Sequence, residues 1–109
     1  MLFLLDAADF LNELEEKSRT KILYTIWKAR LNNDNTLFKK LQDDIWEFRT
    51  HYNKTYYRLF AFWDKSDKLN AVVVVSHGII KKSDKVHLSD LAKAKSAQKQ
   101  YFNEKNDNQ

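Results

Sequence analysis

The sequence predicts a single α+β domain, in which an N-terminal helical hairpin packs on a small, mostly antiparallel twisted sheet and a C-terminal helix follows. The 109 residues, 43% of them hydrophobic and 14% aromatic, provide one core and exclude a disordered chain. Apolar residues first recur at helical spacing and later alternate with polar residues, as they do in strands. Helices followed by hairpin-linked strands are typical of the α+β class with helices on one face of the sheet.

The N-terminal third is expected to form a short strand and two antiparallel helices. Residues 2–5 are apolar, and from Asp6 onward apolar residues follow one another at three- and four-residue spacing on one stripe. A second helix is predicted from about Ser18, its N-cap, to about Leu31. Residues 32–35 are rich in Asn and Asp and end this helix, because short polar side chains compete for backbone hydrogen bonds.

Three antiparallel strands are predicted next, joined by polar turns. Aromatic and charged residues alternate over residues 45–52, and an aromatic-rich strand follows at 56–63, after the turn at 53–55. Residues 69–80 include four consecutive valines, which indicates a central strand covered on both faces.

The chain is expected to close with a helix and a polar tail. From Leu88 to about Phe102 the apolar residues fall on one side, as in an amphipathic helix. Residues 103–109 are polar and are expected to fray. The predicted domain therefore covers residues 1–102.

Composition narrows the classes of function. The absence of cysteine excludes disulfides and thiolate metal sites, and His51, His77 and His87 lack ligand spacing, so we expect neither a metal nor a small-molecule cofactor. No targeting segment is evident, and the apolar run at 71–75 is too short to span a bilayer. We therefore expect a cytoplasmic protein that does not bind membranes. The net charge of +4 mildly favours a polyanionic partner.

Strand alternation predicts two arginines on the sheet face that points away from the helices. Arg49 and Arg58 lie on adjacent strands, at positions that alternate with the apolar residues expected in the core. Tyr56, Phe60 and Phe62 are expected on the same open face. Cations bind phosphates and exposed rings stack on unpaired bases, so this pattern favours RNA binding.

Further cations and histidines extend this candidate site. Lys54 lies in the turn between the first two strands, and Lys81 and Lys82 follow the central strand. These lysines are candidate RNA contacts. His77, near the end of the central strand, and His87, in the loop after it, are candidates for proton transfer because histidine titrates near neutral pH.

Each of these residues also has a structural interpretation. Arg49 can form an ion pair with Asp64 or near Glu47, as arginines on solvent-facing strands often do. A lysine pair in a loop is commonly solvated, and His77 can be a hydrogen-bonded structural histidine. The three tryptophans are expected in the core.

Several segments carry short patterns that occur together in one family of toxins. Residues 6–14 and 21–24 match its opening helical hairpin, residues 46–49 (WEFR) its L-x-E-L-R strand, residues 57–60 (YRLF) its Y-R-x-x-Y/F strand, residues 76–83 (SHGIIKKS) its L-H-G-F-x-K-K-T strand and loop, and residues 92–101 its closing helix. Nearly the whole chain thus resembles the RelE/ParE superfamily of toxins, in particular its phage-derived HigB branch.

This resemblance implies a RelE-like, microbial-ribonuclease-like fold and an endoribonuclease that cuts messenger RNA at the ribosome without a metal. The 2′-hydroxyl of the RNA attacks the adjacent phosphate, so the protein supplies positioning, proton transfer and cations. The roles implied are Arg58 on the scissile phosphate, Arg49 in support, Lys81 and Lys82 on phosphates, and His77, His87 or Glu47 in proton transfer. The implied partner is a helix-turn-helix antitoxin of the HigA type, covering the open sheet face or the loop from 81 to 87.

The chain also departs from this family, which leaves alternatives open. RelE has lysines where Ile45 and Glu47 stand here, and a tyrosine near Val86 or His87. If His87 does not act as general acid, the chain is a weak or inactive nuclease. A ParE-like inhibitor of DNA gyrase shares the fold, and a non-catalytic nucleic-acid-binding module is the third possibility. The effect of Arg58→Ala on growth inhibition, and the integrity of cellular messages, distinguish the three.

Overall fold

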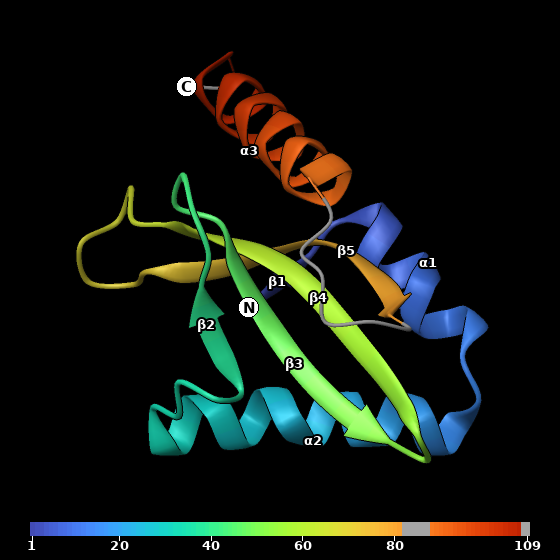
Figure 1. Ribbon diagram of the computed structural model, residues 1–109. Coiled ribbons are helices and arrows are strands. Elements are labelled where there is room, and N and C mark those ends of the chain that lie inside the picture. Colours follow the sequence, from blue (N-terminus) through green and yellow to red (C-terminus); the bar gives the residue numbers. More distant parts are fainter. Residues whose placement is uncertain (82–87, 108–109) are drawn as a thin grey trace.

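The computed structural model of the chain describes residues 1–81 and 88–107, which form three helices and five strands (Figure 1). In chain order these are β1 (Leu2–Phe3), α1 (Leu5–Glu13), α2 (Glu16–Asn32), β2 (Phe38–Lys40), β3 (Trp46–Tyr52), β4 (Thr55–Asp64), β5 (Val72–Lys81) and α3 (Leu88–Asp107). The α+β class is confirmed. In the part of the chain described, no helix combines the length and the apolar character needed to cross a membrane.

The strands form one sheet in the order β1-β5-β4-β3-β2. β1 is parallel to β5, and the other three pairs are antiparallel, so the predicted mostly antiparallel sheet and the central place of the valine-rich strand are confirmed. β2 was not expected, because three residues are too few to show a strand period. It pairs only with Trp46 to Phe48, and the backbone of Arg49 still donates to the Leu37 carbonyl oxygen. Beyond Arg49, β3 is an edge of the described sheet.

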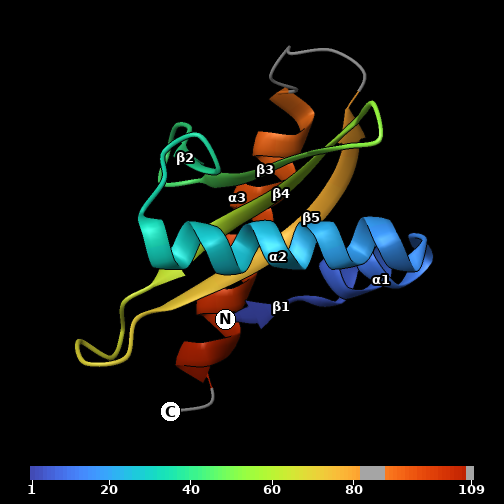
Figure 2. The ribbon, with the colours of Figure 1, turned by 90° about the horizontal axis from the view of Figure 1, so that it is seen from below.

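The sheet lies between two layers of helices. α1 and α2 cover one face, and α3 lies behind the opposite face in Figure 2. The expectation that all helices share one face was therefore wrong for α3. Periodicity shows which side of a helix is apolar, but it does not show which face of a sheet that side will cover.

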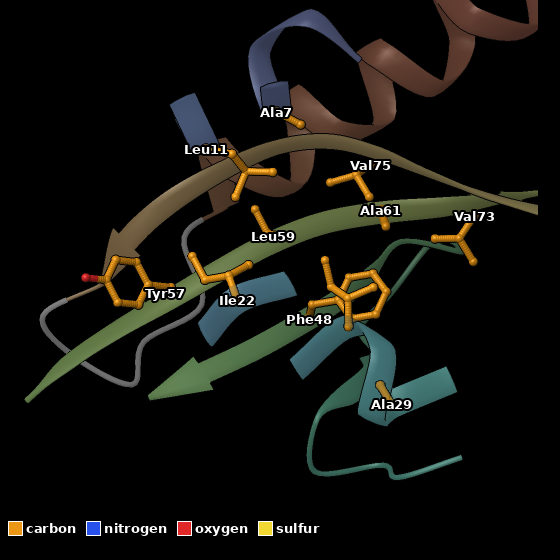
Figure 3. Close-up of a cluster of buried hydrophobic side chains, with 11 residues drawn as sticks. Ala7, Leu11, Ile22, Ala29, Phe48, Tyr57, Leu59, Ala61, Val73 and Val75 are labelled. Atoms are coloured by element: carbon orange, nitrogen blue, oxygen red, sulfur yellow. The ribbon is translucent and has the colours of Figure 1, made fainter. Parts of the chain in front are cut away.

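The larger core fills the space between the sheet and the first two helices (Figure 3). Its buried members are Ala7, Leu11, Ile22, Ile26, Ala29, Phe48, Tyr57, Leu59, Ala61, Val73 and Val75. The ring of Phe10 in α1 covers Gly78 so closely that a Cβ on Gly78 would lie 2.7 Å from Leu59 Cδ2 and less than 3.0 Å from the Phe10 ring. Glycine at this position therefore lets α1 approach the sheet.

A second core lies between the sheet and α3. Phe60 and Phe62, expected as exposed aromatics, are fully buried there with Val74, against Leu91 and Ala94 of α3. The sheet face was assigned correctly by alternation. The expected exposure was wrong because α3 covers this part of the face.

A β-bulge changes the alternation along β5. Phe60 pairs with His77 and Ala61 pairs with Val75, so Ser76 is an extra residue in β5. A bulge shifts the following residue to the other face of the sheet. His77 consequently lies on the α3 side, where its ring stacks on Phe60 at 5.0 Å.

Two predicted helix ends were wrong. α2 begins at Glu16, and Ser18 lies inside it, buried, where the Tyr57 hydroxyl donates a hydrogen bond to Ser18 Oγ at 3.1 Å. α3 continues past Phe102 to Asp107. Lys105 in this last stretch donates to Asp64 Oδ2 at 2.6 Å, which fastens the helix end to β4.

Candidate nucleic-acid interface

The β3–β4 hairpin brings the predicted arginines together. Its two-residue turn consists of Asn53 and Lys54, whose φ angles of 51° and 61° are those of the turns that match the twist of paired strands. This turn fixes the register so that Arg49 is opposite Arg58. Directly paired residues in an antiparallel ladder project to the same face of the sheet, so both arginines lie on the face turned away from α1 and α2.

A buried carboxylate lies between the two arginines. Glu47 Oε1 is 3.4 Å from Arg49 Nε and 3.6 Å from Arg58 Nε. Glu47 and Arg58 are each 3% exposed, whereas the Arg49 side chain is 34% exposed. Glu47 Oε2 has no hydrogen-bond partner among the described residues. Glu47 therefore compensates the charge of Arg58 inside the protein and leaves Arg49 at the surface.

An exposed histidine and tyrosine lie beside these arginines. The rings of His51 and Tyr56, a directly opposed pair of β3 and β4, stack at 4.3 Å with an angle of 8° between their planes. The Arg58 guanidinium carbon lies 5.7 Å from the centre of the Tyr56 ring. His51 was considered only as a metal ligand in the sequence, although its alternation with Glu47 and Arg49 already placed it on the same face.

These side chains border a groove at the edge of β3. The groove has a volume of about 340 Å³, and α2 forms its other wall. We define this basic groove by Lys21, Tyr24 and Lys28 of α2 and by Arg49, His51, Tyr56 and Arg58 of the hairpin. None of the described residues that line it is acidic. Four cations, two phenol rings and an imidazole therefore surround one opening.

Two further hollows continue the basic groove along β3. One, of about 510 Å³, shares Thr36 and Arg49 with it and adds Lys39, Lys40 and Trp46. The other, of about 560 Å³, shares Lys21 and Tyr24 and adds Lys17 and Tyr52, with Glu16 as the acidic residue in its lining. Cationic and aromatic side chains thus follow the strand edge over a longer distance than one nucleotide needs.

His77 lies outside the basic groove. It is 2% exposed, with Nδ1 2.9 Å from Ser76 Oγ and Nε2 3.2 Å from Asp90 Oδ1. Burial lowers the pKa of its imidazole below the ordinary value, and the charge of Lys93 acts in the same direction, while the hydrogen bond to Asp90 opposes the shift. This environment favours the structural interpretation of His77.

The predicted lysines are more scattered than the arginines. Lys81 ends β5, buried and opposite Tyr56 in the register. Lys54 is exposed at the tip of the hairpin and does not line the basic groove. Lys82 and His87 lie outside the described residues. Within 1–81 and 88–107, no three His, Asp or Glu side chains gather as a metal site would require.

The fold and the groove define a small basic α+β protein with one cationic, aromatic-lined strand edge. Residues 9–99 match the family described as phage-derived protein Gp49-like (DUF891), and the chain belongs to this family. The match includes α2 and the β3–β4 hairpin, and so every residue that defines the basic groove. No curated protein and no solved structure matched the chain.

Proposed function

We propose that this Gp49-like protein is the toxin of a type II toxin–antitoxin system, a RelE/HigB-like endoribonuclease that cuts messenger RNA in the basic groove. The observation that carries the proposal is the groove itself, in which Lys21, Lys28, Arg49 and Arg58 surround an exposed His51–Tyr56 stack without an acidic lining residue. Such a site attracts the phosphates of single-stranded RNA and offers a ring for an unstacked base. Membership of the phage-derived family is compatible with this role.

The chemistry requires only groups that this chain supplies. In the proposed reaction His51 takes the proton of the 2′-hydroxyl, whose oxygen bonds to the adjacent phosphorus while the bond from phosphorus to the 5′-oxygen breaks. Arg58 and Arg49 stabilise the negative charge that develops on the phosphate oxygens. The leaving 5′-oxygen takes a proton from a second donor, for which Tyr56 in the groove and His87 are the candidates.

Arg58→Ala is a poor test of this proposal by itself. Removal of Arg58 leaves the buried Glu47 carboxylate without its innermost cation, and breaking a buried ion pair costs roughly 3–5 kcal/mol. Loss of activity could then mean loss of the fold. Arg58→Lys keeps a positive charge opposite Glu47 but removes the planar guanidinium that binds a phosphate through two nitrogens.

The test is growth after tightly controlled expression in a bacterial host, with primer extension on a reporter message. We expect the wild type to arrest growth and to create new 5′ ends. His51→Ala should lower the cleavage rate by about 10²- to 10⁴-fold, the usual effect of losing a general acid or base. Lys99→Ala, an exposed change on α3, is the control and should cleave as the wild type does.

The other two candidate functions are outcomes of the same experiment. Growth arrest with intact messages and a DNA-damage response would replace the nuclease by a gyrase inhibitor. An absence of arrest would leave a non-catalytic nucleic-acid-binding module. Circular dichroism of each variant shows whether an inactive protein is still folded.

A toxin of this kind needs a partner that silences it, and we propose a helix-turn-helix antitoxin of the HigA type, encoded beside this chain. The partner was expected on the open sheet face, but α3 already covers part of that face. Absence of a helix-turn-helix protein from the neighbouring reading frames would argue against the toxin assignment.

A further inference from the structure

The outer side of α2 carries large apolar side chains that take no part in either core. We define this outer apolar stripe by Leu23, Tyr24, Trp27 and Leu31. Residues 23, 27 and 31 are four apart and therefore follow one another along one side of the helix. Trp27 is 55% exposed and Leu31 is 64% exposed. In Figure 2 α2 lies in front of the sheet, and no other described element covers its outer side.

The fold does not need this stripe. Ile22, Ile26 and Ala29 already bury the inner side of α2 against the sheet. Single exposed apolar residues are normal on soluble proteins, but several together on one surface mark an interaction site. The rings of Tyr24 and Trp27 lie 5.8 Å apart, so the stripe is continuous at its centre.

Charge decides between the possible occupants of the stripe. Lys17, Lys28 and Arg30 are exposed on α2, and Lys21 is partly exposed, with its ammonium 5.2 Å from the centre of the Tyr24 ring. The single acidic residue of α2 is Glu16, in its first turn. A second copy of this chain, packed α2 against α2, would place cations opposite cations, which disfavours a symmetric dimer.

We propose that the outer apolar stripe is the docking site for a partner protein that presents an acidic amphipathic helix. The apolar side chains of the partner would cover Trp27 and Leu31, and its carboxylates would lie against Lys21 and Lys28. Helices with an apolar face bind grooves and faces of this kind through a few anchor residues, while flanking charges select the partner.

The stripe and the basic groove share residues, which gives the docking a regulatory consequence. Lys21, Tyr24 and Lys28 line the basic groove from the α2 side. A docked acidic helix takes cations that RNA would otherwise contact, and it leaves His51 and Arg58 on the sheet side uncovered. This consequence rests on the proposed function, whereas the docking itself does not.

An anionic membrane is the other surface that suits a basic, amphipathic helix. The structure favours a protein, because Tyr24 and Lys21 border discrete hollows of about 340 Å³ and about 560 Å³ at the edge of the stripe. Projecting side chains of a helix fill separate hollows, whereas a bilayer presents no fixed projections.

The experiment measures binding of two synthetic helical peptides to the full chain by fluorescence anisotropy. Both peptides carry the same leucines at i, i+3, i+4 and i+7; the first has Glu at its other positions and the second has Lys. We expect the Glu peptide to bind and the Lys peptide not to bind. Trp27→Ala and Leu31→Ala should each weaken the Glu peptide by about tenfold or more, as changes at anchor residues do. Leu69→Ala, in the β4–β5 loop and 92% exposed, is the matched control and should change nothing.

Competition with RNA separates this inference from the proposed function. Lys28→Glu should weaken both the Glu peptide and a 2′-O-methyl oligoribonucleotide, which cannot be cleaved by 2′-oxygen attack. Trp27→Ala should weaken only the peptide. If the peptide docks as expected but does not displace the oligonucleotide, the docking site stands and its regulatory consequence is wrong.

Three results would overturn the docking proposal. The first is equal binding of the Glu and Lys peptides, or no effect of Trp27→Ala. The second is a dimer in analytical ultracentrifugation that Trp27→Ala dissociates, which would assign the stripe to a second copy. The third is Trp27-dependent binding to vesicles of phosphatidylglycerol and phosphatidylcholine in the absence of peptide binding.

Discussion

Single residues set the response of this protein to pH, and His77 is the clearest case. Its imidazole is enclosed between Ser76, Phe60 and the carboxylate of Asp90. Burial is the main reason why its pKa is lowered, so the folded protein holds this ring neutral over a wider pH range than the unfolded chain does.

We predict that stability falls as the pH decreases below about 6.5, the ordinary pKa of histidine. In this range the unfolded chain takes up a proton that folded His77 refuses, and the free energy of unfolding falls until the pH reaches the lowered pKa of the folded state. Thermal unfolding at pH 7.5 and pH 5.5 measures the effect. His77→Gln should reduce the difference in Tm between the two pH values, while His51→Gln, at an exposed position, should leave it unchanged.

Asp64 has the opposite role at the other end of α3. Burial opposes its ionisation, but hydrogen bonds from Lys105, Ser66 and Tyr101 outweigh this and hold the pKa of Asp64 below its usual range. Burial and the same hydrogen bond raise the pKa of Tyr101 to about 12. The stability that Asp64 contributes is present above about pH 3.9 and is lost as the pH falls further toward its lowered pKa.

Asp64→Asn should lower the free energy of unfolding by about 2 kcal/mol, since Lys105 loses its buried acceptor charge while an amide oxygen remains. The matched control is Asp43→Asn, which breaks the exposed pair with Lys95 and should cost less than about 1 kcal/mol. Chemical denaturation at pH 7 measures both. A loss as small as that of the control would show that Asp64 does not fasten α3.

Whole elements were predicted well where a sequence period is long enough to show. The helical spacing in the first third and the alternation along β3 and β4 gave these elements and the correct faces of Arg49 and Arg58. β2 is too short for any period, and the bulge at Ser76 changes the alternation of β5 without a glycine or proline to mark it. The position of α3 depends on contacts distant in sequence, which local patterns do not encode.

The hairpin turn offers a prediction at this scale. Lys54 has a φ of 61°, a conformation that costs an ordinary residue roughly 1–2 kcal/mol and costs glycine much less. Lys54→Gly creates an Asn-Gly turn, the preferred sequence for such hairpins. We expect a higher Tm in thermal unfolding and, because Lys54 does not line the basic groove, unchanged RNA cleavage. Lower cleavage at full stability would return Lys54 to the RNA contacts.

At the scale of the whole molecule, the site could be predicted only in part. Arg49 and Arg58 followed from alternation on two neighbouring strands. The contribution of Lys21, Tyr24 and Lys28 depends on α2 passing the edge of β3, a relation between elements that no single segment reveals. His51 was visible in the pattern but was judged only by metal-ligand spacing.

The hollows along β3 predict that binding strengthens with the length of the RNA. Lys39→Ala combined with Lys40→Ala should weaken a 2′-O-methyl octanucleotide more than a dinucleotide, and should reduce the slope of log affinity against log salt by about 1. Lys68→Ala combined with Lys99→Ala, outside the groove and both hollows, is the control. Equal losses for both oligonucleotides would confine the RNA to the basic groove.

The basic groove has walls from two separate elements, α2 and the β3–β4 hairpin. A polyanion that bridges them acts as a clamp across the joint, so occupancy and folding are thermodynamically linked. At a ligand concentration one hundred times the dissociation constant, this linkage adds about 2.7 kcal/mol to the stability of the occupied protein. In a cell that degrades partly unfolded chains, the molecules that persist longest will be those already holding a partner.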